Sequence, residues 1–174
     1  TDLSAMVVKL KQANPDIVFI YSIPKPTAMF LKEAQKMGWK PNIVGANPIA
    51  HPDTGRLAGD AVNGLKVVFY TALGDFTEPL ALEKINILKK YSPEAVVGYY
   101  AFHGMVGAIL VTEGLKRTGP DVTVDKFIKA METLKEFDTG LVPPITYEPG
   151  KHSGTSRFAA AEWKDGKMVV IKKW

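Results

Sequence analysis

Short apolar runs alternate with longer segments of helical periodicity over the first seventy residues. Residues 16–21 and 42–45 are apolar and rich in β-branched and aromatic side chains, which is typical of strands buried on both faces. Residues 27–37 place apolar side chains at helical spacing and end at Gly38, with Ala28, Phe30, Leu31, Ala34 and Met37 forming the inner face. This order predicts an α/β fold with a parallel sheet flanked by helices.

The pattern continues with a third strand, three helices and a β-rich tail. Ser4 is expected to cap a first helix that ends at Asn14, and Thr123 to cap a later one. We expect a strand at 65–70, a loop at 71–79, and helices at 80–91, 96–117 and 124–134. Asp165-Gly166 between two apolar runs predicts a C-terminal β-hairpin.

Four glycines lie within the predicted helix at 96–117. Glycine lowers helix propensity, so close packing against another element is the expected reason for Gly98, Gly104, Gly107 and Gly114.

Composition narrows the function classes. The chain has 174 residues with 46% hydrophobic and 23% charged side chains, enough for one ordinary domain, and no apolar run approaches the roughly 20 residues of a membrane span. The net charge of +4 comes from scattered lysines, which argues against a nucleic-acid partner. The sequence has no cysteine, so disulfides and thiol chemistry are excluded. We also expect no cleavable leader, and a processed chain or a fragment.

Catalytic and cofactor motifs are missing from the sequence. We find no Gly-x-Gly-x-x-Gly after a strand, no phosphate loop and no nucleophile elbow. The three histidines lack a second ligand at metal spacing, and Asp53 and Asp60 fit a polar helix pair better than an acid/base pair. We therefore expect no enzyme activity, no cofactor and no metal.

The expected ligand site is at the carboxyl ends of the strands, where parallel α/β sheets bind ligands. Tyr21 and Ser22 follow the first strand, Asn47 and Pro48 follow the second, and Tyr70 follows the third. The tyrosines fit strand-end packing equally well, and Asn47 fits a turn former. His103 begins the glycine-rich helix and equally fits a packed histidine bonded to backbone.

Several passages resemble one known family. The "LKxxNPDxV" pattern of 10–18, together with 30–41, 57–65 and 100–104, is similar to type I periplasmic binding proteins. The most specific matches are 137–147 and 152–167. More narrowly, the sequence resembles the branched-chain amino-acid (Leu/Ile/Val) receptors of ABC importers, over essentially the whole chain.

This resemblance implies the C-terminal half of a two-lobe receptor. Residues 1–70 would be second-lobe βα units, 71–136 helices that pack on the first lobe, and 137–174 return strands with the hairpin. The implied function is extracytoplasmic, periplasmic solute binding by lobe closure, with an ABC permease as partner. A half receptor leaves sheet edges uncovered, so we expect a homodimer or exchange of elements between copies.

One departure from the family concerns the ligand. By alignment, an acidic residue that meets a ligand ammonium is replaced by Asn47, and two family tyrosines by Ile23 and Met105. The resemblance then implies a ligand without an α-ammonium, such as an aromatic or aliphatic carboxylate or an amide. The predicted ligand-binding residues are Tyr21, Ser22, Ile23, Asn47, Pro48, Tyr70, His103 and Met105. The alternatives are a regulatory sensor of the same fold and, as a weaker rival, an α/β enzyme.

Overall fold

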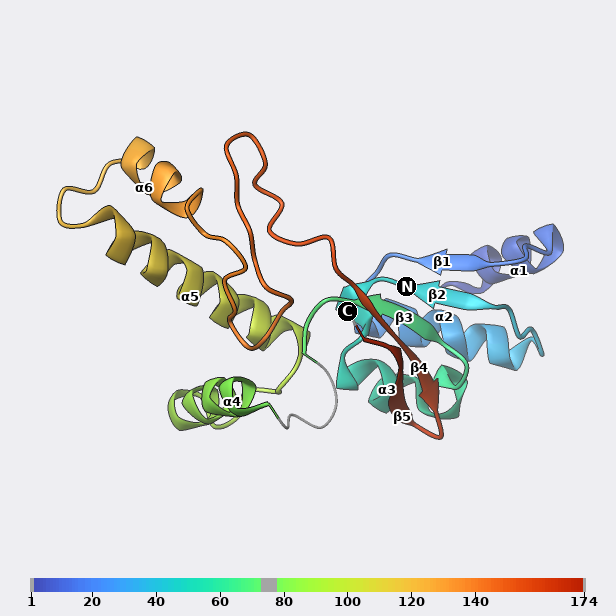
Figure 1. The fold of residues 1–174 in the computed structure, drawn as a ribbon. Helices are drawn as coiled ribbons and strands as arrows, with labels where there is room; N and C mark the ends of the chain where they lie inside the picture. Colours follow the sequence, from blue (N-terminus) through green and yellow to red (C-terminus); the bar gives the residue numbers. More distant parts are fainter. Residues whose placement is uncertain (1, 73–77, 174) are drawn as a thin grey trace. The chain divides into compact units, whose positions relative to one another are not determined.

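The protein, in a computed structural model that describes residues 2–72 and 78–173, forms two compact units (Figure 1). One unit contains residues up to 69 together with 158–173, and the other contains residues 70–157. The three-segment division expected from the sequence stays a prediction.

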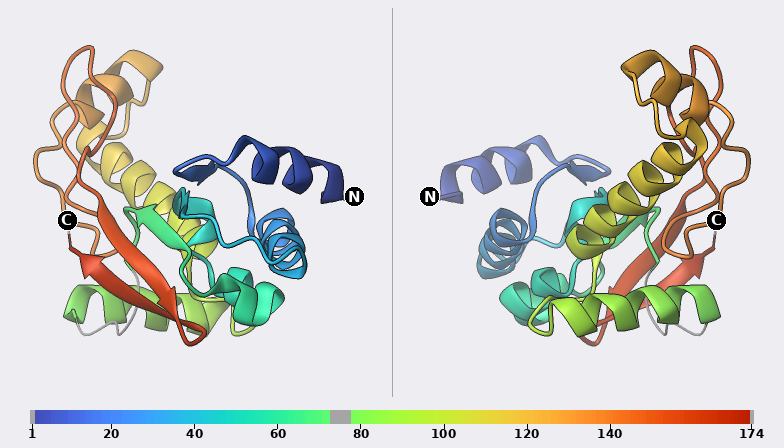
Figure 2. Two further views of the ribbon diagram at one scale, coloured as in Figure 1. Left: turned by 90° about the vertical axis from the view of Figure 1, so that its right-hand side faces the viewer. Right: turned by 90° about the vertical axis from the view of Figure 1, so that its left-hand side faces the viewer.

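A five-stranded sheet of order β1-β2-β3-β4-β5 organises the first unit. β1 (Val18–Ile20), β2 (Ile43–Gly45) and β3 (Lys66–Phe69) are parallel, in a register that pairs Val18 with Ile43. β4 (Ala159–Lys164) runs antiparallel to β3 and to β5 (Lys167–Lys172), as Figure 2 shows. Asp165 and Gly166, which connect β4 to β5, both have a positive φ, as the tight turn of a β-hairpin requires. The predicted α/β sheet and C-terminal hairpin are confirmed.

Helices α1 (Ser4–Ala13), α2 (Pro24–Lys36) and α3 (Pro52–Ala58), with short 3₁₀ turns η1 (Asn47–Ile49) and η2 (Gly59–Val62), complete this unit. α2 buries Ala28, Phe30, Leu31 and Ala34 as the sequence predicted, while Met37 is half-buried. α3 packs on β4 at Gly55, where a Cβ atom would overlap the ring of Trp163. The core lies between these helices and one face of the sheet.

Two expectations about the start of the chain are wrong. β1 is buried on one face only, because Val18 is 8% exposed whereas its neighbours Ile17 and Phe19 are 56% and 64% exposed. Alternate residues of a strand point to opposite faces, and no described element of the first unit covers the second face. Ser4 is the first helical residue rather than the cap, and the Asp2 carboxylate accepts hydrogen bonds from its amide (2.8 Å) and hydroxyl (2.6 Å).

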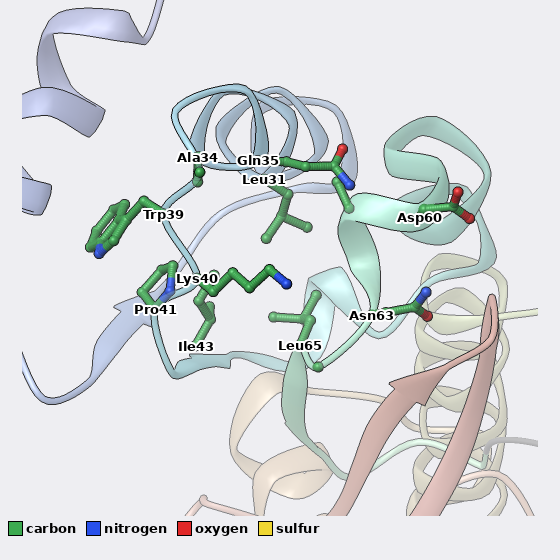
Figure 3. Close-up of a pocket in the computed structure, with 13 residues that line it drawn as sticks. Leu31, Ala34, Gln35, Trp39, Lys40, Pro41, Ile43, Asp60, Asn63 and Leu65 are labelled. Carbon is green, nitrogen blue, oxygen red and sulfur yellow. The ribbon is translucent and has the colours of Figure 1, made fainter.

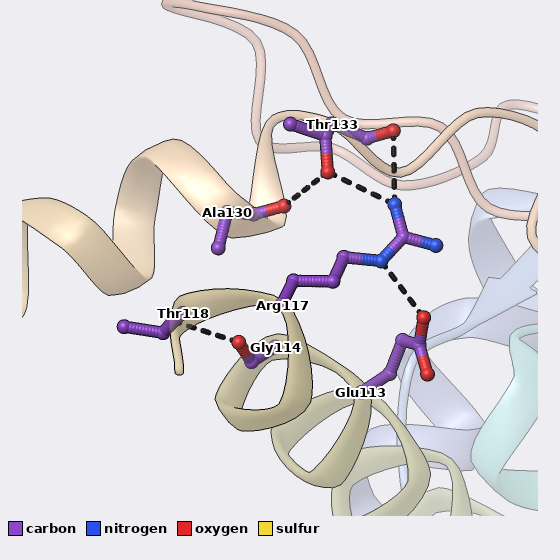
Figure 4. A network of polar contacts seen from close by, with 6 residues as sticks. All are labelled: Glu113, Gly114, Arg117, Thr118, Ala130 and Thr133. Atoms are coloured by element: carbon purple, nitrogen blue, oxygen red, sulfur yellow. Dashed lines mark hydrogen bonds and ion pairs between the residues drawn. The ribbon is translucent and has the colours of Figure 1, made fainter. Parts of the chain in front are cut away.

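The second unit contains α4 (Pro79–Tyr91), α5 (Tyr99–Thr118) and α6 (Val124–Met131). The Thr123 hydroxyl caps α6 as predicted, accepting from the amide of Lys126. A polar network joins the end of α5 to the turn after α6: Arg117 donates to Glu113 (2.8 Å) and to the Thr133 hydroxyl (2.9 Å), as Figure 4 shows. The loop predicted at 71–79 lies largely outside the described residues.

Candidate ligand-binding site

The tips of β1 and β2 lie side by side in the first unit. The amide of Ala46 donates to the carbonyl of Ile20 (3.1 Å), so the ladder between the two strands continues one residue beyond β2. Because the strands are parallel, the residues that follow them emerge at the same edge of the sheet. Tyr21, Ser22 and Ile23 are thereby brought next to Asn47 and Pro48, as the sequence predicted.

The first tip presents apolar and hydroxyl groups to the surface. Tyr21 is 81% exposed and Ile23 54% exposed, with Ser22 half-buried between them. Ile23 is the N-cap residue of α2, and its carbonyl accepts from the amide (3.2 Å) and the hydroxyl (2.9 Å) of Thr27. Pro24 fits the first helical position, where its missing N–H costs nothing. The backbone of this tip is therefore fixed while its side chains remain accessible.

The second tip is more enclosed. Asn47 is 6% exposed and begins η1, which is closed by hydrogen bonds from Ile49 to Ala46 (3.1 Å) and from Ala50 to Asn47 (3.0 Å). Gly45 makes this geometry possible, because a Cβ atom there would overlap the side chain of Ile49. The close packing of Ile49 against β2 holds the Asn47 amide at the end of the strand.

The two tips carry little charge. Residues 20–26 and 45–50 include one charged side chain, Lys25, and no carboxylate. Hydrogen bonding at this edge therefore depends on the hydroxyls of Tyr21 and Ser22, the Asn47 amide and the backbone. Such groups suit a ligand that is neutral or anionic at the atoms they contact.

His51 is a buried residue near the second tip whose role sequence reasoning missed. It is the N-cap of α3, and its Nδ1 accepts a hydrogen bond from the amide of Asp53 (3.2 Å). Burial lowers the pKa of His51 below its ordinary value, a shift that Asp53 partly opposes. The neutral imidazole is required here, because a protonated Nδ1 cannot accept. The only sequence signal was its place before Pro52, the first residue of the helix.

A second cluster of predicted residues lies in the second unit. The hydroxyl of Tyr70 and Nε2 of His103 are 2.9 Å apart, although 33 residues separate them in the chain. The ring of Tyr99 covers the imidazole with a centroid distance of 4.3 Å, and burial lowers the pKa of His103. The backbone beyond Tyr70 is anchored by the amide of Ala72, which donates to the carbonyl of Leu141 (2.7 Å). The imidazole of His103 is therefore lined by aromatic rings and favoured in its neutral form.

Met105 does not join this cluster. It follows His103 by two residues on α5, which places the two side chains about 200° apart around the helix. The structure thus brings together five predicted residues in the first unit and Tyr70 with His103 in the second. Tyr99 belongs with the latter pair.

The comparisons with known proteins identify the family. Residues 1–167 match the family model described as "Periplasmic binding protein". The chain belongs to this family. The prediction of a binding protein rather than an enzyme is confirmed by the membership. A relative from Brucella abortus (strain 2308), named "Leu/Ile/Val-binding protein homolog 7", is 25% identical over 98% of this chain and 44% of its own length. This periplasmic binding protein sequence thus spans about half the length of the curated relatives that it matches.

Solved structures agree on the fold. A branched-chain amino-acid ABC transporter protein from Thermus thermophilus with bound valine superposes with a TM-score of 0.88, at 24% identity over 99% of this chain and 49% of that one. A fatty acid ABC transporter substrate-binding protein from Thermomonospora curvata gives 0.82 at 21% identity, over 99% of this chain and 46% of that one. At such identities the likeness shows the architecture, not the ligand.

Two further properties of the described residues concern membranes and metals. None of its helices is both long and apolar enough to cross a bilayer. No three His, Asp or Glu side chains within residues 2–72 and 78–173 are grouped closely enough to hold a metal ion.

Proposed function

We propose that this chain is part of an extracytoplasmic solute receptor that delivers a small organic molecule to an ABC importer. The observation that carries the proposal is the pair of adjacent strand tips, Tyr21–Ile23 and Asn47–Pro48, in a periplasmic binding protein. In such a receptor the ligand is held between two lobes, and contacts to both lobes stabilise the closed state over the open one. The names of the relatives, which refer to branched-chain amino acids and fatty acids, support a small ligand with an aliphatic part.

The proposed ligand lacks an α-ammonium group. Neither tip has a carboxylate, and a buried ammonium without an acidic partner costs several kcal/mol. The amide of Asn47 and the hydroxyl of Ser22 can instead donate to a carboxylate or accept from an amide. We therefore favour an aliphatic or aromatic carboxylate, or an amide.

The test compares two ligands with the same carbon skeleton, 4-methylpentanoate and L-leucine, on the complete gene product that carries this sequence. We expect 4-methylpentanoate to bind more tightly in calorimetry and to raise Tm further. Asn47→Asp should weaken 4-methylpentanoate at least tenfold, because it places two carboxylates together, and should improve leucine binding. Gln12→Glu adds the same charge on the exposed face of α1 and should change neither affinity. Tighter binding of leucine than of 4-methylpentanoate by the unaltered protein would overturn the proposed ligand class.

A further inference from the structure

A pocket of about 370 Å³ lies at the opposite end of the strands in the first unit (Figure 3). It forms where α2 ends and where β2 and β3 begin, so it shares no residue with the two strand tips. Its volume is within the range of small-molecule sites. The lining residues include Leu31, Ala34, Gln35, Trp39, Lys40, Ile43, Asp60, Asn63 and Leu65.

The floor of the pocket is apolar and belongs to the buried core. Leu31, Ala34, Ile43 and Leu65 are between 2% and 5% exposed, and they belong to the core between α2 and the sheet. Trp39 stands at the rim, where its ring meets Phe30 edge to face with a centroid distance of 6.2 Å. An apolar side chain placed here would contact preformed core surface, which lowers the ordering cost of binding.

Two opposite charges flank this floor. The side chain of Lys40 extends across the pocket with its ammonium toward the middle, and Asp60 stands on the far side (Figure 3). Within the described part of the chain, neither side chain makes an ion pair or a hydrogen bond. Asn63, on the same side of the pocket as Asp60 (Figure 3), accepts a hydrogen bond at its Oδ1 from the amide of Gly166 (3.2 Å). The pocket therefore offers one cationic and one anionic partner above an apolar surface.

We infer that this pocket binds a small zwitterion with an apolar side chain, of which an α-amino acid is the simplest form. The carboxylate would pair with Lys40, the ammonium with Asp60, and the side chain would pack on Leu31 and Leu65. A ligand with a single charge satisfies only one of the two flanking groups. This second site is separate from the proposed ligand site at the strand tips and prefers the opposite ligand chemistry.

The test uses three probes with the same phenyl ring: L-phenylalanine, 3-phenylpropionate, which lacks the ammonium, and phenethylamine, which lacks the carboxylate. The indole N–H of Trp39, followed by ¹H–¹⁵N NMR, reports binding at the rim of this pocket and is assigned with Trp39→Phe. We expect a saturable shift with phenylalanine, at a lower Kd than with either singly charged probe.

Substitutions at the exposed residues Lys40 and Asp60 test the contribution of each charge to binding separately. Lys40→Met should raise the Kd of phenylalanine and phenylpropionate roughly three- to fivefold without affecting phenethylamine, which is the scale of partly exposed ion pairs. Asp60→Asn should weaken phenylalanine and phenethylamine instead. The controls Lys32→Met and Asp16→Asn make the same charge changes on exposed side chains outside the pocket and should leave all three titrations unchanged.

Several results would overturn the inference. They are the absence of a saturable Trp39 shift up to about 10 mM phenylalanine, equal affinity for the three probes, or an unchanged phenylalanine Kd in either pocket variant. Asn47→Asp distinguishes this site from the strand tips. It should change the 4-methylpentanoate affinity while leaving the Trp39 titration with phenylalanine as it was, so each site can fail without the other.

Discussion

Single residues fix the backbone around the predicted ligand site, but the roles of some of them could not be predicted from the sequence. Parallel strand order sufficed to predict that Tyr21 and Asn47 would be neighbours. It could not reveal that His103 contacts Tyr70, because that pair depends on how α5 packs rather than on a local pattern. His51 was equally hidden, since an imidazole that caps a helix has no characteristic spacing.

His51 should make the stability of the protein pH-dependent. Its pKa is lowered in the folded state by burial, so the unfolded chain binds a proton first as the pH falls. The contribution of His51 is then complete above its unfolded pKa near 6.5 and is lost as the pH falls below that value, by at most about 1.4 kcal/mol per pH unit. His51→Asn keeps a capping oxygen but cannot titrate, so its stability should fall less between pH 7 and 5.

Urea unfolding at several pH values measures this difference. At pH 7.5, where the imidazole is neutral in both states, the variant and the unaltered protein should lie close together and provide the reference. Parallel stability–pH curves for the two proteins would show that the buried histidine is not the titrating group.

At the scale of elements, the glycines of α5 divide into two classes that the sequence could not distinguish. Gly114 lies against α6, where a Cβ atom would overlap the side chains of Phe127 and Met131. Around Gly104 and Gly107 nothing lies within 4 Å of an added Cβ. The expectation of close packing is therefore confirmed for Gly114 and wrong for the other two within the described residues.

Alanine substitution should lower the free energy of unfolding in the first class of glycine and raise it in the second. Gly114→Ala should destabilise the second unit by about 1–3 kcal/mol, because the added methyl group overlaps the side chains of Phe127 and Met131, which must shift. Gly107→Ala, the matched control on the same helix, should stabilise it by up to about 1 kcal/mol through helix propensity. Chemical denaturation followed by circular dichroism measures both. A loss of stability with Gly107→Ala would indicate that another surface packs closely there in solution.

For β1, the sequence predicted the strand but not how many of its faces are buried. The run from Ile17 to Tyr21 correctly predicted a strand of the parallel sheet, because its side chains are apolar and β-branched or aromatic. It also predicted burial on both faces, and that was wrong. An apolar run predicts a strand, but it does not say whether an element of the same stretch of chain covers both of its faces.

At the scale of the whole molecule, the exposed face and free edge of β1 bear on the predicted homodimer. β1 pairs only with β2 among the described strands, and Ile17 and Phe19 project from it with 56% and 64% exposure. An apolar edge strand of this kind is a template for pairing with a second chain. We expect residues 1–174 alone to self-associate through this surface.

Phe19→Lys should shift the chain toward a monomer, because burial of the added ammonium opposes association while the folded unit keeps it in solvent. Val124→Lys is the matched control, since Val124 is 74% exposed at the start of α6 in the other unit, and it should leave the mass unchanged. Light scattering over a concentration series measures both. A monomeric mass for the unaltered chain throughout the series would show the homodimer prediction to be wrong. Equal loss of association in the two variants would place the contact elsewhere than on β1.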